Sequence, residues 1–105
     1  MSFEFAVRVD ALPEVGAVLV ELAGRPVAVV RDEDGDVHAV DDTCSHANVS
    51  LAEGEVDGCT IECWLHGSRF DLRTGKPTGM PATEPVPVYP VKIEDDDVLV
   101  AIEES

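Results

Sequence analysis

The sequence has few basic residues, few aromatic residues and no long apolar run. Seven lysines and arginines stand against 22 acidic residues, which gives a formal net charge of −15. Nucleic acid is therefore not an expected partner, because phosphate contacts require clustered basic side chains. No apolar run approaches the roughly 18 residues of a membrane-spanning helix, and the first residues do not resemble a secretory signal. We expect a cytoplasmic protein that does not bind a membrane.

The scarcity of aromatic residues limits how the core can be built. The 105 residues include three Phe, one Tyr and one Trp. Most of the core must therefore come from Val, Leu, Ile and Ala, and β-branched valine favours strands over helices. A chain of this length is expected to form one domain, 1–105.

Period-two alternation of apolar and polar residues, broken by frequent turn signals, predicts an antiparallel all-β framework. Asp34-Gly35 marks a hairpin turn, because glycine tolerates a positive φ. One helical turn is possible at 48–53. The predicted strands are 3–9, 17–22, 26–31, 37–40, 69–72, 86–91, 92–94 and 98–102.

The alternation fades between residue 41 and about residue 68. We therefore divide the chain into a β base, 1–40 and 69–105, and a loop-rich subdomain, about 41–68. Loops of this length in a compact domain are usually functional. The subdomain is expected to have no apolar core of its own, so a metal would supply the missing cohesion.

Two short motifs in this subdomain combine thiols with imidazoles. They are Cys44-Ser45-His46 and, after sixteen intervening residues, Cys63-Trp64-Leu65-His66. Structural zinc is one interpretation, since zinc accepts both donor types. Zinc sites are commonly built from C-x-x-C pairs, however, whereas each arm here has one Cys and one His. That arrangement is typical of an asymmetric 2Fe–2S cluster, in which one iron takes both thiolates and the other both imidazoles.

The motifs resemble those of the Rieske ferredoxins, the small soluble electron carriers of bacterial ring-hydroxylating oxygenases. The resemblance rests on three segments in the same order: Asp42-Thr43-Cys44-Ser45-His46, the stretch 62–71 around the second motif, and the proline-containing stretch 79–86. It implies the Rieske fold, with an antiparallel β-sandwich or barrel-like base and a small cluster-binding subdomain. It also implies one 2Fe–2S cluster held by Cys44, His46, Cys63 and His66, with both imidazoles at the surface.

The resemblance further implies an electron carrier without substrate turnover of its own. A flavin-dependent ferredoxin reductase would reduce the protein, which would dock briefly on a terminal oxygenase; we expect a monomer. Three alternatives stay open: the small Rieske subunit of a nitrite reductase-like complex, a ferredoxin linked to iron–sulfur assembly, and a structural zinc module that recruits proteins.

Several neighbours of the ligands are expected to support the cluster. Gly67 would bring a backbone N–H close to a ligand or sulfide. High-potential Rieske subunits of cytochrome bc complexes, to which the second motif is similar, use a Ser and a Tyr hydroxyl after the second His, and carry an extra cysteine in each arm. Here Ser68 and Phe70 stand at those positions and the extra cysteines are missing. We therefore expect a potential near the bottom of the class range of roughly −150 to +300 mV. Candidates for shielding the cluster from water are Trp64, Leu65, Met80 and Pro81.

Three other features are given structural roles. Cys59 is expected to be a small buried hydrophobe rather than a zinc ligand; about 13 Å along a strand would separate it from Cys63, too far for a disulfide. His38 is expected to be a satisfied or exposed strand histidine. The acidic segment 32–36 lacks the glycine and glutamate spacing of a calcium loop and is interpreted as a charged hairpin.

Overall fold

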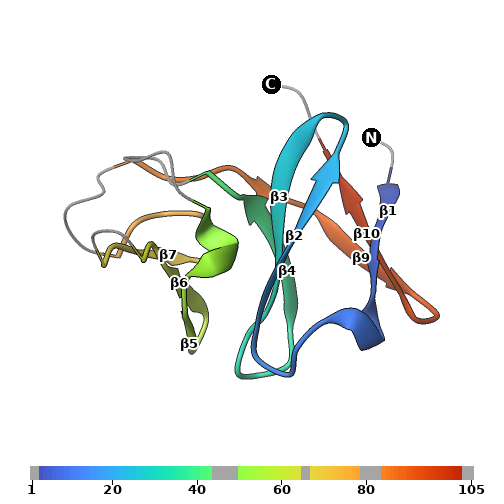
Figure 1. Ribbon diagram of the computed structural model, residues 1–105, viewed down its shortest axis with the longest axis horizontal. Coiled ribbons are helices and arrows are strands. Elements are labelled where there is room, and N and C mark those ends of the chain that lie inside the picture. Colours follow the sequence, from blue (N-terminus) through green and yellow to red (C-terminus); the bar gives the residue numbers. More distant parts are fainter. Residues whose placement is uncertain (1–2, 44–49, 65–66, 79–83, 103–105) are drawn as a thin grey trace.

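The computed structural model describes residues 3–43, 50–64, 67–78 and 84–102 (Figure 1). This part of the chain forms three antiparallel sheets, with strand orders β1-β10-β9, β2-β3-β4-β8 and β5-β6-β7. The all-β prediction is confirmed. No helix among these residues is long and apolar enough to span a bilayer. The strands are β1 (Phe3–Arg8), β2 (Gly16–Leu22), β3 (Arg25–Arg31), β4 (Val37–Asp41), β5 (Val56–Asp57), β6 (Thr60–Glu62), β7 (Arg69–Asp71), β8 (Val88–Tyr89), β9 (Val91–Glu94) and β10 (Asp97–Ala101).

Strand β3 is buried on both of its faces. Its four residues from Val27 to Val30 are all completely buried. A strand covered on one face alternates between apolar and polar residues, whereas a strand covered on both reads as a continuous apolar run. The sheet β2-β3-β4-β8 therefore lies in the middle of the molecule, with the other two sheets on either side of it (Figure 1).

Alternate residues of β3 face two different cores. Val27 and Val29 belong to a core that includes Val98 and Val100 of β10, between the central sheet and the sheet β1-β10-β9. The opposite face contributes to a second core, shared with the small sheet β5-β6-β7. This second core, here called the site-side core, contains Ala28, Val30, Val40, Leu51, Ile61, Cys63, Phe70, Leu72 and Val86.

The segment 41–68 has no separate core, as expected, but it contributes to the site-side core that it shares with the base. Leu51, Ile61 and Cys63 all come from this segment and are fully buried. The segment also contains β5, β6 and the 3-10 turn η2 (Leu51–Glu53), which lies inside the predicted helical turn. Strands of two and three residues are too short to show a period in the sequence, which explains why they were missed.

Two predicted strands are arranged differently from the expectation. The stretch 86–91 is not one strand, because Pro90 separates β8, which pairs with β4, from β9, which pairs with β10. Proline has no N–H for a ladder, so it favours such a break. Strand β7 was assigned to the base, but it pairs with β6 of the segment 41–68. The division into base and subdomain itself stays a prediction.

Gly54 permits a close approach of two backbone segments beside the second motif. It follows η2, and a Cβ built on it would overlap the carbonyl oxygen of Glu62, the residue before Cys63. The neighbouring hydrogen bond from the N–H of Glu62 to the carbonyl of Glu55, 2.8 Å long, holds these segments together. The φ of Gly54 is −84°, so steric space rather than backbone conformation requires glycine here.

We predict that Gly54→Ala lowers the free energy of unfolding by about 3 kcal/mol, at the upper end of the usual cost of overpacking, because backbone cannot move aside as a side-chain tip can. Chemical denaturation of the variant measures this loss. Gly24→Asn is the matched control, since Gly24 has open space around it and asparagine tolerates its φ of +76°. Equal stability of Gly54→Ala and the parent protein would show that the two segments are not in contact.

Candidate metal centre

Of the four predicted cluster ligands, Cys63 lies within the described residues. Cys44, His46 and His66 lie outside them, as do Leu65, Met80 and Pro81 of the predicted shield. Cys63 follows β6 directly and its side chain is completely buried in the site-side core. Its thiol is free of any disulfide. A buried thiol of this kind is the soft donor that iron–sulfur clusters use, so the residue fits the predicted role.

Hydrogen bonds fix the backbone turn that carries Cys63. The N–H of Cys63 donates to the carbonyl of Ser68 at 2.6 Å, and the N–H of Gly67 donates to the carbonyl of Cys63 at 2.8 Å. Gly67 has a φ of +78°, a conformation that glycine adopts without strain. The turn between β6 and β7 is thus closed at its base, and Ser68 is buried beside it.

The residues on either side of the first motif are held close together. Thr43 and Ser50 form an antiparallel bridge, and the N–H of Leu51 donates to the carbonyl of Asp42. The buried Asp42 carboxylate also accepts a hydrogen bond from the N–H of Ala52, 2.8 Å long, in the first turn of η2. The chain therefore leaves the fold after β4 and rejoins it before η2 at two points that hydrogen bonds hold side by side.

The proline-containing stretch is anchored at both of its described ends. Before it, the N–H of Thr78 donates to the carbonyl of Arg69 at 2.8 Å. At its other end, the N–H of its last residue, Val86, donates to the carbonyl of Gly75, and the N–H of Asp41 donates to the carbonyl of the following residue, Pro87. The ends of the stretch are therefore tied to β7, which follows the second motif, and to β4, which precedes the first.

Trp64 and Arg69 lie next to the second motif. The Trp64 side chain is about half exposed, at 49%. Arg69 forms an ion pair with Glu62 at 2.8 Å, joining the last residue of β6 to the first of β7. The pair links the two strands at the cross-strand position next to Cys63.

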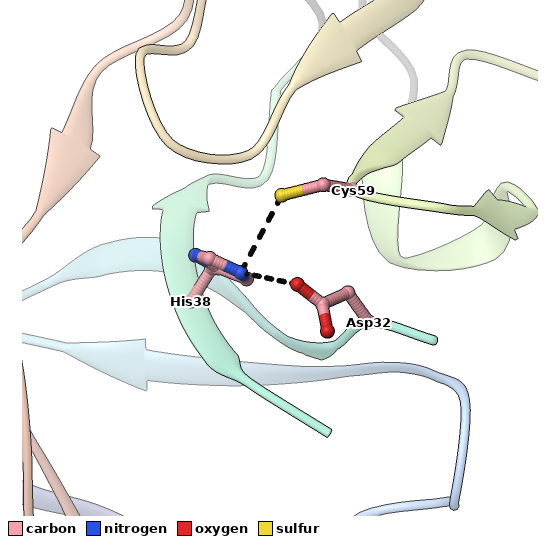
Figure 2. A group of neighbouring side chains, drawn as sticks. All are labelled: Asp32, His38 and Cys59. Atoms are coloured by element: carbon pink, nitrogen blue, oxygen red, sulfur yellow. Dashed lines mark hydrogen bonds and ion pairs between the residues drawn. The ribbon is translucent and has the colours of Figure 1, made fainter. Parts of the chain in front are cut away.

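A second group of metal-binding side chains lies apart from the two motifs. Asp32, His38 and Cys59 converge at the site drawn in Figure 2. Nε2 of His38 lies 2.8 Å from Oδ2 of Asp32 and 3.7 Å from Sγ of Cys59. His38 is therefore a satisfied strand histidine, as predicted. Cys59 packs against the site-side core while only partly buried, and its contact with His38 was not foreseen.

Opposing effects act on the ionisation of this group. Burial disfavours the Asp32 carboxylate, but hydrogen bonds from His38 and from the N–H groups of Asp36 and Asp34 outweigh it and lower the pKa of Asp32. Burial raises the pKa of the Cys59 thiol, and the nearby guanidinium of Arg73 opposes that rise. No spacing motif could have revealed this group of three side chains, because Cys59 and His38 are 21 positions apart in the sequence and only tertiary packing brings them together.

The chain is similar in sequence and structure to known ferredoxins. Residues 3–90 match the Rieske [2Fe-2S] domain. The "3-phenylpropionate/cinnamic acid dioxygenase ferredoxin subunit" of Photorhabdus laumondii is 43% identical, over all of this chain and 99% of that protein. The ferredoxin of carbazole 1,9a-dioxygenase from Nocardioides aromaticivorans superposes with a TM-score of 0.91 at 36% identity, over 98% of this chain and 100% of that one.

A further solved structure contains a related ferredoxin with its partner. It is a complex of reduced oxygenase and oxidized ferredoxin in carbazole 1,9a-dioxygenase, and the match has a TM-score of 0.89 at 35% identity, over 98% of this chain and 95% of that one. These similarities extend over the full length and agree with the buried thiol after β6. The predicted 2Fe–2S cluster and the predicted electron-carrier class are thereby confirmed. The chain belongs to the Rieske [2Fe-2S] domain family and is a ferredoxin of that type.

Proposed function

We propose that this ferredoxin carries single electrons from a flavin-dependent ferredoxin reductase to the terminal oxygenase of an aromatic dioxygenase system. The observation that carries the proposal is the 43% identity, over essentially the full length of both chains, to a dioxygenase ferredoxin subunit. The bound 2Fe–2S cluster supplies the one-electron chemistry. The protein itself holds the cluster, limits its contact with water and presents it to partners.

The ligands we assign are Cys44 and Cys63 for one iron and His46 and His66 for the other. Cys63 supports the assignment because its thiol is buried and its backbone is held at both the N–H and the carbonyl. The bridge between Thr43 and Ser50 supports it for the first arm, since it fixes the points where that arm leaves and rejoins the fold. Rigid anchoring limits rearrangement when the charge of the site changes.

The described surroundings of Cys63 favour exclusion of water on one side and contact with partners on the other. Leu51, Ile61 and Phe70 are completely buried in the same core as Cys63. Trp64, the next residue, is half exposed and offers an apolar contact at the surface. Aromatic side chains are enriched where proteins dock. We assign Trp64, with Met80 and Pro81, to the rim that shields the cluster and meets a partner.

The acidic surface provides long-range attraction to partners. A net charge of −15 on 105 residues steers the protein toward a basic patch on another protein. Attraction of this kind raises the association rate more than the affinity, which suits an electron carrier that must leave after each transfer. We propose a monomer that docks through a small interface.

The first prediction from the proposed function concerns the ligands. Cys63→Ser, Cys44→Ser and His66→Cys should each lose or rebuild the cluster, because each changes a donor atom on iron. Iron content and the visible and EPR spectra measure this. His38→Ala is the control, and its spectrum should match that of the parent protein. Bleaching of the His38→Ala variant would mean that the ligand set is wrong.

The second prediction concerns the reduction potential. Hydrogen bonds to cluster sulfurs stabilise the reduced state. Phe70 lacks the hydroxyl that a tyrosine would carry and is completely buried among apolar residues. An equilibrium redox titration should therefore give a midpoint below about +100 mV. A value well above that would contradict the low-potential assignment.

The third prediction concerns the electron path. Mixed with a flavin-dependent ferredoxin reductase and a ring-hydroxylating oxygenase encoded beside its own gene, the holoprotein should support NADH-dependent product formation. The rate at subsaturating protein should fall as salt rises, because salt screens the acidic surface. Cluster-free Cys63→Ser protein is the control. Purification as a stable complex with a large catalytic subunit would instead indicate the nitrite reductase type of small subunit.

A further inference from the structure

We propose that Asp32, His38 and Cys59 form a second metal site, distinct from the 2Fe–2S cluster, that binds a zinc-like divalent cation. The site would take one carboxylate oxygen, one imidazole nitrogen and one thiolate from the protein. Zinc commonly binds three such protein ligands and keeps its fourth position for water.

The three donor atoms cluster around Nε2 of His38 and do not form a hydrogen-bonded chain through both nitrogens of the ring. Oδ2 of Asp32 and Sγ of Cys59 both approach the same ring nitrogen, Nε2 of His38 (Figure 2). A proton relay through histidine would use its two ring nitrogens separately, as a catalytic triad does. All three donor atoms lie within 4.8 Å of one another, close enough for one cation to bind all three after small shifts of the side chains.

The distances come close to those of tetrahedral zinc. Bond lengths of about 2.3 Å to sulfur and 2.0–2.1 Å to nitrogen and oxygen place S and N about 3.6 Å apart, and N and O about 3.3 Å apart. The structure has 3.7 Å between Sγ of Cys59 and Nε2 of His38. Oδ2 of Asp32 and Nε2 of His38 are 2.8 Å apart, so the cation would replace their shared proton and separate them by about half an ångström.

The backbone and the outer hydrogen bonds already orient these side chains. The other Asp32 oxygen, Oδ1, accepts hydrogen bonds from the N–H groups of Asp34 and Asp36, at 2.9 and 3.0 Å. Partners of this kind fix the direction of a metal-binding carboxylate. The Asp32 side chain is 1% exposed and that of His38 is 15% exposed, so both ligands are largely shielded from bulk water.

The site would join two hairpins of different sheets. Asp32 and His38 flank the turn between β3 and β4, whereas Cys59 lies in the turn between β5 and β6. The turns already touch, because the N–H of Gly58 donates to Oε2 of Glu33 at 2.8 Å. A cation bound here would add a bond between the central sheet and the small sheet that carries Cys63.

The chemistry of the donors selects the kind of cation. Sulfur and nitrogen donors suit zinc and its transition-metal neighbours, while magnesium and calcium require mainly oxygen donors. The net charge of −15 raises the local concentration of any cation. Binding releases the thiol proton of Cys59, and the positive guanidinium of Arg73 beside it favours the thiolate that results.

The test is calorimetric titration of Zn²⁺ into holoprotein that holds two irons per chain. We expect one Zn²⁺ per chain, with unchanged iron content and visible spectrum. Cys59→Ala and His38→Ala should each weaken binding by more than about tenfold, since even loss of an outer-shell partner costs 10- to 100-fold. The cluster spectrum of each variant verifies that it is folded.

A pair of matched variants distinguishes Zn²⁺ binding at this site from nonspecific attraction of Zn²⁺ to acidic residues. Asp32→Asn and Asp34→Asn change the same charge two positions apart, but only Asp32 supplies a donor atom. Asp32→Asn should weaken Zn²⁺ binding and Asp34→Asn should leave it within about twofold, while an excess of Mg²⁺ should not compete. Any of three results would overturn the proposal: no Zn²⁺ uptake, uptake that persists in Cys59→Ala, or uptake only with loss of iron.

Discussion

Burial of both faces of β3 joins the two halves of the molecule. Val27 and Val29 pack toward the sheet β1-β10-β9, and Ala28 and Val30 pack toward the small sheet. A strand placed in this way cannot shift by one residue without exchanging its two sets of side chains. The registers of β2 and β4 follow from that constraint, and so does the position of the turn between β3 and β4 against the small sheet.

The packing of β3 also fixes the position of the candidate metal centre. Cys63 is both a proposed iron ligand and a member of the site-side core, where Ile61 and Phe70 pack beside it. The chain therefore needs no separate scaffold for the cluster, because Cys63 directly follows the buried strand β6. Apolar burial and metal binding would therefore both stabilise the segment 41–68. The sequence alone suggested that the metal would have to stabilise this segment in place of an apolar core.

The sequence was informative where a pattern is local. The hairpin at Asp34-Gly35 and the paired Cys and His motifs depend on residues close together in the chain, and they predicted the turn after β3 and the cluster. The alternation at 3–9 predicted a strand, which the structure forms at Phe3–Arg8, but its expected buried face is wrong because Phe3 and Phe5 are exposed. Strands β5 and β6 have too few residues to show a period. The convergence of Asp32, His38 and Cys59 depends on two hairpin turns meeting in space, which no local pattern encodes.

The proposed cluster has two thiolates on one iron and two imidazoles on the other. Pulsed EPR of the reduced holoprotein, prepared with ¹⁵N-labelled histidine, tests it most directly, because only nitrogen bonded to iron couples strongly to the unpaired electron. Ligation by His46 and His66 should give two strongly coupled histidine nitrogens. A spectrum with one such nitrogen, or with none, would contradict it.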